Sequence, residues 1–354
     1  MIRLSYVFLT ILLITSCGEG KEETKRPSSP RIRKQSSIVS PTQNQNFVRG
    51  TSISIEVKSS EEFEIDSVQL TIGDQVNTYF ESAFEATIAS RQVGTWRLLL
   101  KVFSGKSSET HYRNVIVLPE NEPVAYTYTI ENTFPHSTED YTQGLLVKDG
   151  SLYESTGQRG ESTFKKKNLT TGETEKVVNL SSDLFGEGLA LLDNEFYQLT
   201  WTSGQGFVYN DQMEQIRTFN YQVQGWGLTT LNEELVLTDE TEKLYFLDPS
   251  SFTIRKKIEV YDNEGKVDAL NELEVIDGLL YANVYLKDYI VVIDPETGEV
   301  LRKIDCSGLL TDDEAKNADV LNGIAYDQKS GAIFITGKWW PKLFEVTFQP
   351  KTLQ

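Results

Sequence analysis

The sequence predicts an all-β protein in which an Ig-like β-sandwich precedes a five-bladed β-propeller. Two observations carry this expectation: short alternating strands without a helical period fill residues 38–120, and a strand–turn–strand motif recurs five times within residues 121–354. The 354 residues suffice for two domains. Their composition, 39% hydrophobic and 24% charged, is that of a globular chain rather than a disordered or collagen-like one.

Residues 1–16 predict a signal peptide, and residues 17–37 predict a tether. Arg3 precedes the apolar run Tyr6–Ile14, which is too short for a stable membrane anchor but fits a signal-peptide core. The run ends in Leu13-Ile14-Thr15-Ser16-Cys17, which resembles the lipobox of bacterial lipoproteins and implies acylation of Cys17. An ordinary leader that happens to contain a cysteine is the alternative. We therefore expect an exported bacterial lipoprotein, anchored in the cell envelope as a periplasmic or outer-membrane protein.

The net charge and the small numbers of cysteines and histidines exclude several classes of function. The net charge of −18 argues against a nucleic-acid partner, because a protein that binds a polyanion must neutralise phosphates. The chain has two cysteines, and lipidation of Cys17 would leave Cys306 without a partner for a disulfide. Its two histidines, His111 and His136, are too few for a histidine-rich metal centre.

The region 38–120 shows strands whose apolar and polar residues alternate. The clearest are residues 51–57, 67–72, 95–103 and 113–118, with glycines at the turns between them. Five to seven short strands in about 80 residues are typical of an Ig-like sandwich. No cluster of reactive side chains is visible here, so a spacer or a partner-docking module is the expected role.

The region 121–354 repeats itself. The apolar residue that marks each copy stands at positions 145, 189, 228, 273 and 324, with spacings of 44, 39, 45 and 51 residues. Each copy continues through a turn into a second strand. Repeats of 40–50 residues built from strands and turns are typical of propeller blades, whereas a β-solenoid would show shorter periods.

The repeat alignment places unusual residues on one ring. The position two residues before each mark is never aliphatic; it holds Gln143, Glu187, Trp226, Asn271 and Asn322. The ends of the second strands contribute Trp201, Asp239, Tyr285 and Lys338. We expect both sets to line one mouth of the central channel. The plainer interpretation is a polar, water-filled channel with tryptophans packed between blades.

Eight short segments of this region resemble, in order, the blade motifs of plant-type and bacterial glutaminyl-peptide cyclotransferases. They are Tyr141–Gly144, Glu154–Gly157, Phe185–Gly188, Leu199–Trp201, Gly225–Thr229, Leu270–Glu274, Leu321–Ile324 and Thr336–Pro341. The resemblance covers residues 124–348 and implies a five-bladed propeller. It also implies conversion of an N-terminal glutaminyl residue of a peptide or protein into pyroglutamyl with release of ammonia.

The resemblance assigns roles to residues. Glu187 is the expected general acid and base, because one carboxyl that takes a proton and returns it serves both amine attack and ammonia departure. Lys338 or Asn271 would stabilise negative charge on the amide oxygen, and Gln143 would hold the substrate amide or amine. The expected substrate-binding residues are Tyr141, Phe185, Trp201, Trp226, Tyr285 and Asn322. Tyr285 stands where papaya-type members carry Trp, and Tyr141 where Phe is usual, which puts substrate preference in question.

Two other functions compete. A metal-dependent propeller hydrolase could use Glu187, Asn271 and Asp239 as oxygen ligands for calcium. A non-catalytic surface propeller would grip a peptide or sugar with its aromatic residues. We expect no required cofactor, leave room for a structural calcium ion, and expect a monomer that meets the membrane through its lipid anchor.

Overall fold

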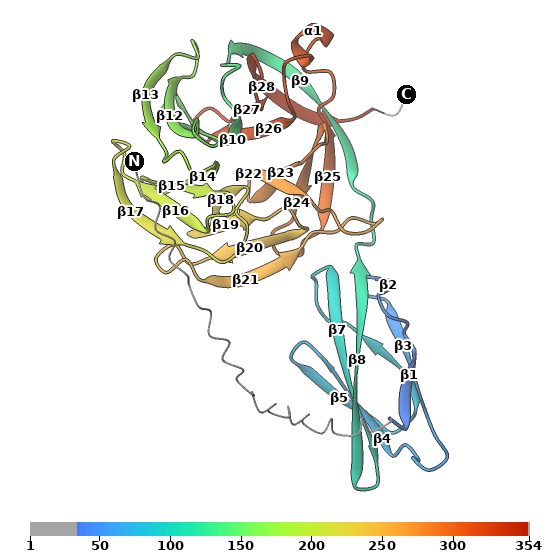
Figure 1. Ribbon diagram of the computed structural model, residues 1–354. Helices are drawn as coiled ribbons and strands as arrows, with labels where there is room; N and C mark the ends of the chain where they lie inside the picture. The colour runs from blue at the N-terminus through green and yellow to red at the C-terminus, as the bar shows by residue number, and fades with distance from the viewer. Residues whose placement is uncertain (1–33, 353–354) are drawn as a thin grey trace, which may run out of the picture.

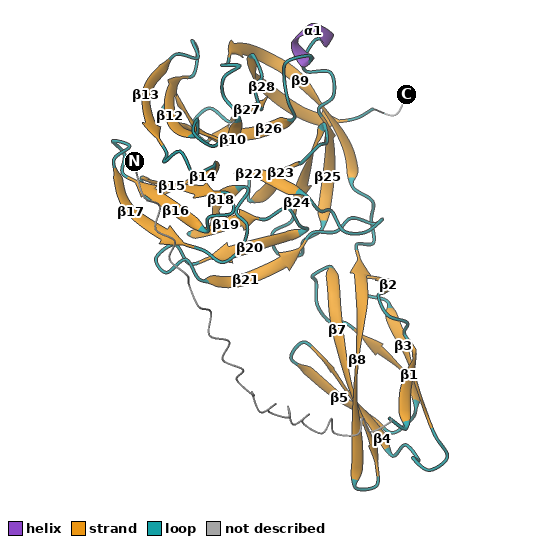
Figure 2. Ribbon diagram, viewed as in Figure 1, coloured by secondary structure: helices purple, strands orange, loops and turns teal. Residues whose placement is uncertain are grey.

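The computed structural model describes residues 34–352 and is all-β (Figure 1). Figure 2 shows strands almost throughout, with one short helix, α1 (Asp312–Ala315), near the C-terminal end. In the described part of the chain, none of the helical structure has the length and apolar character needed to cross a membrane. The predicted signal peptide, the lipidated Cys17 and most of the tether lie outside the described residues.

The N-terminal body consists of eight strands in two sheets. The strands are β1 (Ser36–Ser40), β2 (Gln45–Val48), β3 (Ser52–Ser59), β4 (Ser67–Ile72), β5 (Gln75–Tyr79), β6 (Ala83–Thr87), β7 (Gly94–Ser104) and β8 (Ser107–Leu118). The sheet orders are β1-β3-β6 and β2-β8-β7-β4-β5. Alternate residues of β3, β4 and β7 point inward, and one core joins the two sheets, with Ile55, Leu70 and Leu100 at its centre.

The strands predicted for this body lie close to the observed ones, but the predicted number of strands is too low. Strand β4 has the predicted bounds, and β7 differs from its prediction by one residue at each end. Eight strands form instead of five to seven, because the short strands β2, β5 and β6 have mostly exposed residues and so lack the alternation that marks a buried strand.

The C-terminal body contains the remaining strands. Three sheets have four antiparallel strands each: β10 (Thr142–Lys148), β11 (Ser151–Thr156), β12 (Thr163–Asn168) and β13 (Thr174–Asn179); β14 (Gly186–Leu192), β15 (Glu195–Thr200), β16 (Gln205–Tyr209) and β17 (Gln215–Asn220); β18 (Leu228–Leu231), β19 (Glu234–Thr238), β20 (Lys243–Leu247) and β21 (Ile254–Glu259). An eight-stranded sheet completes the body, in the order β22 (Leu270–Ile276), β23 (Leu279–Val284), β24 (Tyr289–Ile293), β25 (Val300–Asp305), β9 (Val124–Pro135), β28 (Lys342–Pro350), β27 (Ala332–Gly337) and β26 (Leu321–Asp327).

The first strand of each group faces the centre of this body. Strand β10 contacts β14, β14 contacts β18, β18 contacts β22, β22 contacts β26, and β26 contacts β10. Strand β9 closes the outside, because it pairs antiparallel with β28 and parallel with β25. Figure 1 shows β9, from the first half of the chain, beside β28 at its end.

Glycines allow the inner strands to approach one another. A Cβ on Gly144 would lie 2.4 Å from the backbone nitrogen of Leu189, and one on Gly227 would lie 2.0 Å from the carbonyl oxygen of Asn271. Glu272 holds the corresponding place on β22. Its buried carboxyl accepts hydrogen bonds from the N–H groups of Leu145 (3.3 Å) and Ile324 (2.8 Å), so it fills the centre and ties β22 to β10 and β26.

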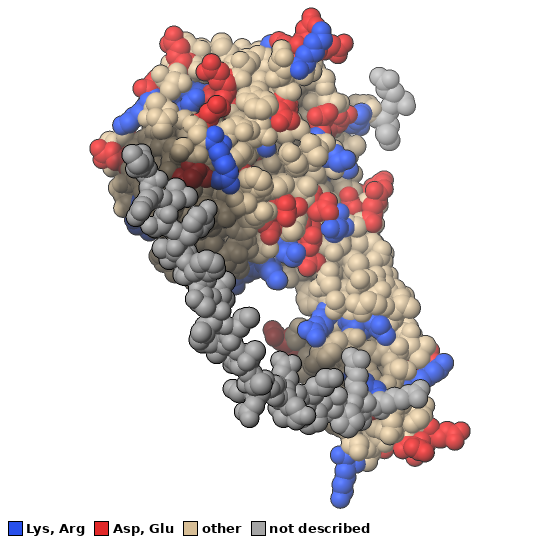
Figure 3. Space-filling view, viewed as in Figure 1, with Lys and Arg blue, Asp and Glu red and all other residues tan. Residues whose placement is uncertain are grey.

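The two bodies touch where β7 begins. The N–H of Val93 donates to the carbonyl of Thr297 (2.9 Å), and Arg49 forms an ion pair with Glu299 (2.6 Å). Val93 also packs with Leu118 and Tyr261 in a small shared core. On the face drawn in Figure 3, acidic and basic side chains are interspersed over the C-terminal body.

Candidate active site

A cavity of about 270 Å³ opens at the end of the C-terminal body where the inner strands begin. Nine of the ten side chains that line it are residues singled out from the sequence. They are Tyr141, Gln143, Phe185, Glu187, Trp201, Trp226, Asn271, Tyr285 and Lys338; Gln158 is the tenth. The repeat alignment therefore identified one continuous pocket.

Local strand geometry aims the polar residues into this pocket. The pairing of β10 with β11 shifts register between Thr142 and Gly144, and the same irregularity occurs around Glu187 in β14 and Asn271 in β22. A β-bulge redirects a side chain that regular alternation would send elsewhere. Gln143, Glu187 and Asn271 each lie within such a bulge, and Lys338 directly follows β27.

Aromatic rings form the wall. Tyr141 makes edge contacts with Phe185 and Trp339, at centroid distances of 6.0 Å and 4.7 Å, and Phe185 continues to Trp201 at 5.6 Å. On the other side, Trp226 and Tyr285 meet at 5.5 Å. Trp201 is 36% exposed, which places it at the rim, while Glu187 and Lys338 are each only 3% exposed. The pocket thus has a buried floor that carries Glu187 and Lys338, and an aromatic entrance.

Glu187 and Lys338 are the charged pair of this floor. Burial raises the pKa of Glu187 well above its ordinary value, and this effect is opposed by the Lys338 ammonium and by a hydrogen bond from Gln143. Burial lowers the pKa of Lys338, opposed by Glu187 and Asp319. The Lys338 ammonium lies over the rings of Tyr141 (4.8 Å) and Tyr285 (5.2 Å). The two pKa values are therefore shifted toward one another.

Asn271 presents an unused acceptor. Its Oδ1 atom is buried and has no hydrogen-bond partner among residues 34–352. Since buried polar atoms are nearly always paired in native proteins, this oxygen is suited to an N–H group of a bound molecule. From the sequence we expect Asn271 to donate to an oxyanion, whereas the free acceptor favours the opposite polarity.

Two predicted participants lie elsewhere. Asn322 is fully buried and does not line the cavity; it sits behind Gln143, to which its amide nitrogen donates at 3.1 Å. Asp239 does not line it either, because its carboxylate accepts from the hydroxyls of Tyr245 (2.7 Å) and Thr241. Gln158 was missed. It belongs to the loop after β11 and has a positive φ of 84°, which no sequence pattern indicates for glutamine.

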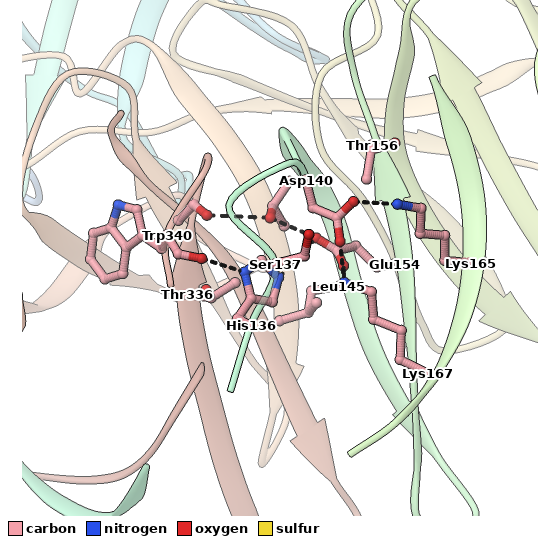
Figure 4. A network of polar contacts seen from close by, with 12 residues as sticks. His136, Ser137, Asp140, Leu145, Glu154, Thr156, Lys165, Lys167, Thr336 and Trp340 are labelled. Atoms are coloured by element: carbon pink, nitrogen blue, oxygen red, sulfur yellow. Dashed lines mark hydrogen bonds and ion pairs between the residues drawn. The ribbon is translucent and has the colours of Figure 1, made fainter. Parts of the chain in front are cut away.

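A second polar cluster, drawn in Figure 4, lies at the start of β10. His136, Asp140 and Glu154 are the one group of three potential metal ligands within residues 34–352, with ligand atoms within 4.8 Å of one another. The Lys167 ammonium already donates to both carboxylates, at 2.5 Å to Glu154, and Lys165 also pairs with Asp140. A lysine holds the position that a cation would take, so this donor set fits an internal ion pair rather than a metal.

This ion cluster, defined by His136, Asp140, Glu154, Lys165 and Lys167, anchors the start of β10. The Thr142 hydroxyl donates to Glu154 at 2.7 Å and lies 3.3 Å from the carbonyl of Gly337, next to Lys338. Both ring nitrogens of His136 face acceptor oxygens, those of Trp340 and Glu154. The cluster thereby joins the two segments that carry Gln143 and Lys338.

Comparison with known proteins identifies the relatives of this chain. The model of the glutamine cyclotransferase family matches residues 98–348. A glutaminyl-peptide cyclotransferase of Arabidopsis thaliana is 38% identical over 219 residues, which cover 60% of this chain and 68% of that protein. The crystal structure of Myxococcus xanthus glutaminyl cyclase matches with a TM-score of 0.60 and 37% identity, over 65% of this chain and all of that one. The chain belongs to the glutamine cyclotransferase family.

Proposed function

We propose that the protein is a glutaminyl-peptide cyclotransferase whose proton-transferring residue is Glu187. Membership of the family supports the activity on peptides with an N-terminal glutamine. One observation carries the role of the residue. Glu187 is the only carboxylate that lines the cavity within the described chain, and burial raises its pKa while a lysine faces it.

The reaction forms one C–N bond and breaks another. The neutral α-amine attacks the side-chain amide carbon of the same residue, and Glu187 takes the proton that this nitrogen loses. Glu187 then delivers that proton to the nitrogen of the side-chain amide. The bond between this amide nitrogen and the carbon under attack breaks, and ammonia leaves. The acceptor Oδ1 of Asn271 holds an N–H of the substrate, and Lys338 stabilises negative charge on the amide oxygen.

The aromatic wall supports cyclisation over hydrolysis. A peptide enters past Trp201, and its glutaminyl side chain fills the cavity between Phe185, Trp226 and Tyr285. Excluding water from this space leaves the α-amine as the available nucleophile.

Ammonia release from a Gln-initiated dipeptide tests the proposal. Purified residues 34–354, which keep β1 whole, are expected to release ammonia in the presence of EDTA, and Glu187→Gln is expected to lower kcat by about a hundredfold to ten-thousandfold. An Asn-initiated dipeptide is the matched control, since its shorter side chain would have to close a four-membered ring. Activity that disappears with EDTA would favour the metal-dependent alternative, and full activity of the variant would remove Glu187 from its role.

The metal-dependent hydrolase has weak support, because Asp239 is engaged outside the cavity and leaves a single carboxylate in its lining. Calcium prefers six to eight oxygen ligands, several of them carboxylates. We propose that the reaction needs no cofactor, with a structural calcium ion elsewhere left open to metal analysis. A silent binding protein would hold the dipeptide without releasing ammonia, which the same assay detects.

We also propose an architecture and a location. The closed order of inner strands supports a five-bladed propeller, with β9 as the outer strand of the last blade, and the two packed sheets before it support an Ig-like sandwich. The domains would be residues 38–120 and 121–354. The lipobox-like segment supports a lipoprotein of the bacterial envelope, which we propose to be a monomer. Incorporation of labelled palmitate into the wild type but not into Cys17→Ser would test the anchor.

A further inference from the structure

We propose that Asn322 is a positioning residue that fixes the orientation of the Gln143 amide, so that Gln143 presents its N–H group to Glu187. This inference rests on the proposed function. It gives Asn322 a role different from the substrate contact expected from the sequence, because Asn322 is fully buried and does not line the cavity.

The orientation follows from a backbone carbonyl. The side-chain nitrogen of Asn322 lies 2.9 Å from the carbonyl oxygen of Thr142, and a carbonyl can only accept a hydrogen bond. Asn322 must therefore turn its NH₂ group to this side. The same nitrogen lies 3.1 Å from the Gln143 side chain, so both of its hydrogens are used.

Gln143 must accept the hydrogen bond from Asn322 with its side-chain oxygen. A side-chain amide has its oxygen and its nitrogen on opposite sides, so fixing Oε1 against Asn322 directs Nε2 the other way. On that side lies the cavity that Gln143 shares with Glu187, and a hydrogen bond from the Gln143 side chain lowers the pKa of the Glu187 carboxyl. The order of donors, from Asn322 to Gln143 to Glu187, is thus set by an atom of the backbone.

The orientation of the Gln143 amide matters because a side-chain amide can rotate by half a turn and exchange the places of its oxygen and its nitrogen. Without the Asn322 donor, Gln143 can place either its oxygen or its nitrogen against Glu187. An oxygen there would disfavour the carboxylate and would accept a hydrogen bond only from the protonated acid. The active form of Glu187 would then be available only at higher pH.

The other groups around Glu187 do not depend on Asn322. Lys338 faces it from the end of β27, Tyr141 from the segment before β10, and Tyr221 from the loop after β17. The two hydrogen bonds of the Asn322 amide nitrogen go to Thr142 and Gln143 and not to any of these three side chains. A change at Asn322 therefore reaches Glu187 through Gln143.

The test compares two buried asparagines of the same body. Asn322→Leu removes the donor at similar size, and Asn322→Ser is a smaller second variant should the first fold poorly. Asn283→Leu is the matched control: Asn283 is 1% exposed, accepts from the N–H of Gly323 at 2.9 Å and does not line the cavity. Circular dichroism and thermal unfolding establish that each variant is folded.

The first measurement is the dependence of kcat/KM on pH for the Gln-initiated dipeptide. Asn322→Leu is expected to lower kcat/KM about tenfold near neutral pH and to move its acid limb up by about one pH unit. Asn283→Leu is expected to leave the limb in place. In a Gln143→Leu background, Asn322→Leu is expected to add no further shift, because the two residues act in series.

The second measurement does not require activity. The carboxyl ¹³C resonance of Glu187, assigned through Glu187→Gln, reports its titration directly, and its midpoint is expected to rise in Asn322→Leu and not in Asn283→Leu. An inactive wild type with this rise would refute the proposed function and leave the positioning role standing. An unchanged midpoint in Asn322→Leu, or an equal shift in the Gln143→Leu background, would overturn the positioning role.

Discussion

Glu154 on β11 and Glu187 on β14 are both buried glutamates, yet their pKa values are shifted in opposite directions. Burial raises the pKa of both carboxyls. At Glu154 it is outweighed by Lys167 and His136, which hold that pKa far below its ordinary value, and Thr142 also donates to this carboxylate. At Glu187, burial is opposed only by the charge of Lys338 and by one hydrogen bond from Gln143, so the effect of burial on its pKa is the larger one. The charged and hydrogen-bonding neighbours therefore determine which buried carboxyl stabilises the fold and which can transfer a proton.

The two lysines repeat this contrast, and replacing them should give the largest effect on stability. Lys167→Met leaves Glu154 and Asp140 without their shared cation, so we expect a loss of about 3–5 kcal/mol in the free energy of unfolding. Lys338→Met should change it by less than about 1 kcal/mol, because Glu187 can take up a proton when its cationic neighbour is lost. Urea unfolding followed by tryptophan fluorescence measures both. Equal losses in the two variants would contradict the contrast.

A smaller effect should appear in the pH dependence of activity. The Lys338 ammonium favours the charged form of Glu187 and so lowers its pKa; removing it in Lys338→Met must raise that pKa further. Glu187 acts first as a base, so activity is lost as pH falls through its pKa. We therefore expect the acid limb of kcat/KM to move up by about one pH unit. A limb that stays in place, or moves to lower pH, would show that Lys338 does not act on Glu187.

The smallest expected change concerns the shape of the wall. Tyr285 contacts Trp226 and lies near the Lys338 ammonium. Tyr285→Trp restores the ring expected from the family resemblance but takes space from the cavity, so we expect KM to change by about twofold to fivefold with kcat nearly constant. Tyr285→Phe keeps the size and should match the wild type. A large fall in kcat in either variant would give Tyr285 a part in the chemistry rather than in substrate fit.

The sequence predicted the pocket better than it predicted the ion cluster. Register marks located Gln143, Glu187 and Asn271, because the same bulge recurs at the same place in the inner strands β10, β14 and β22. The run Lys165–Lys167 gave no comparable signal. In it, Lys165 pairs with Asp140, Lys166 with Glu175, and Lys167 turns inward to acids on other segments. Such pairing depends on tertiary structure and has no period to detect.

The limits at Asn322 and in the fold have a similar origin. Asn322 shares the repeat position and the bulge of the pocket residues, yet its amide nitrogen donates to the Thr142 carbonyl and to Gln143 instead of facing the cavity. The repeats predicted five strand groups, but nothing in residues 124–135 indicated that β9 would pair with two distant strands. Long-range pairing of this kind is specified by the whole body and not by a local pattern.

The pairing of β9 has a consequence for how the protein is made. Strand β9 leaves the ribosome directly after the N-terminal body, but its antiparallel partner β28 is roughly 200 residues further along the chain. At about 5–20 residues per second, β9 waits on the order of 10–40 s with an unpaired edge. An unpaired strand edge can join another chain. Nascent chains are therefore most exposed to misassembly during this interval, which ends only when the last strand arrives.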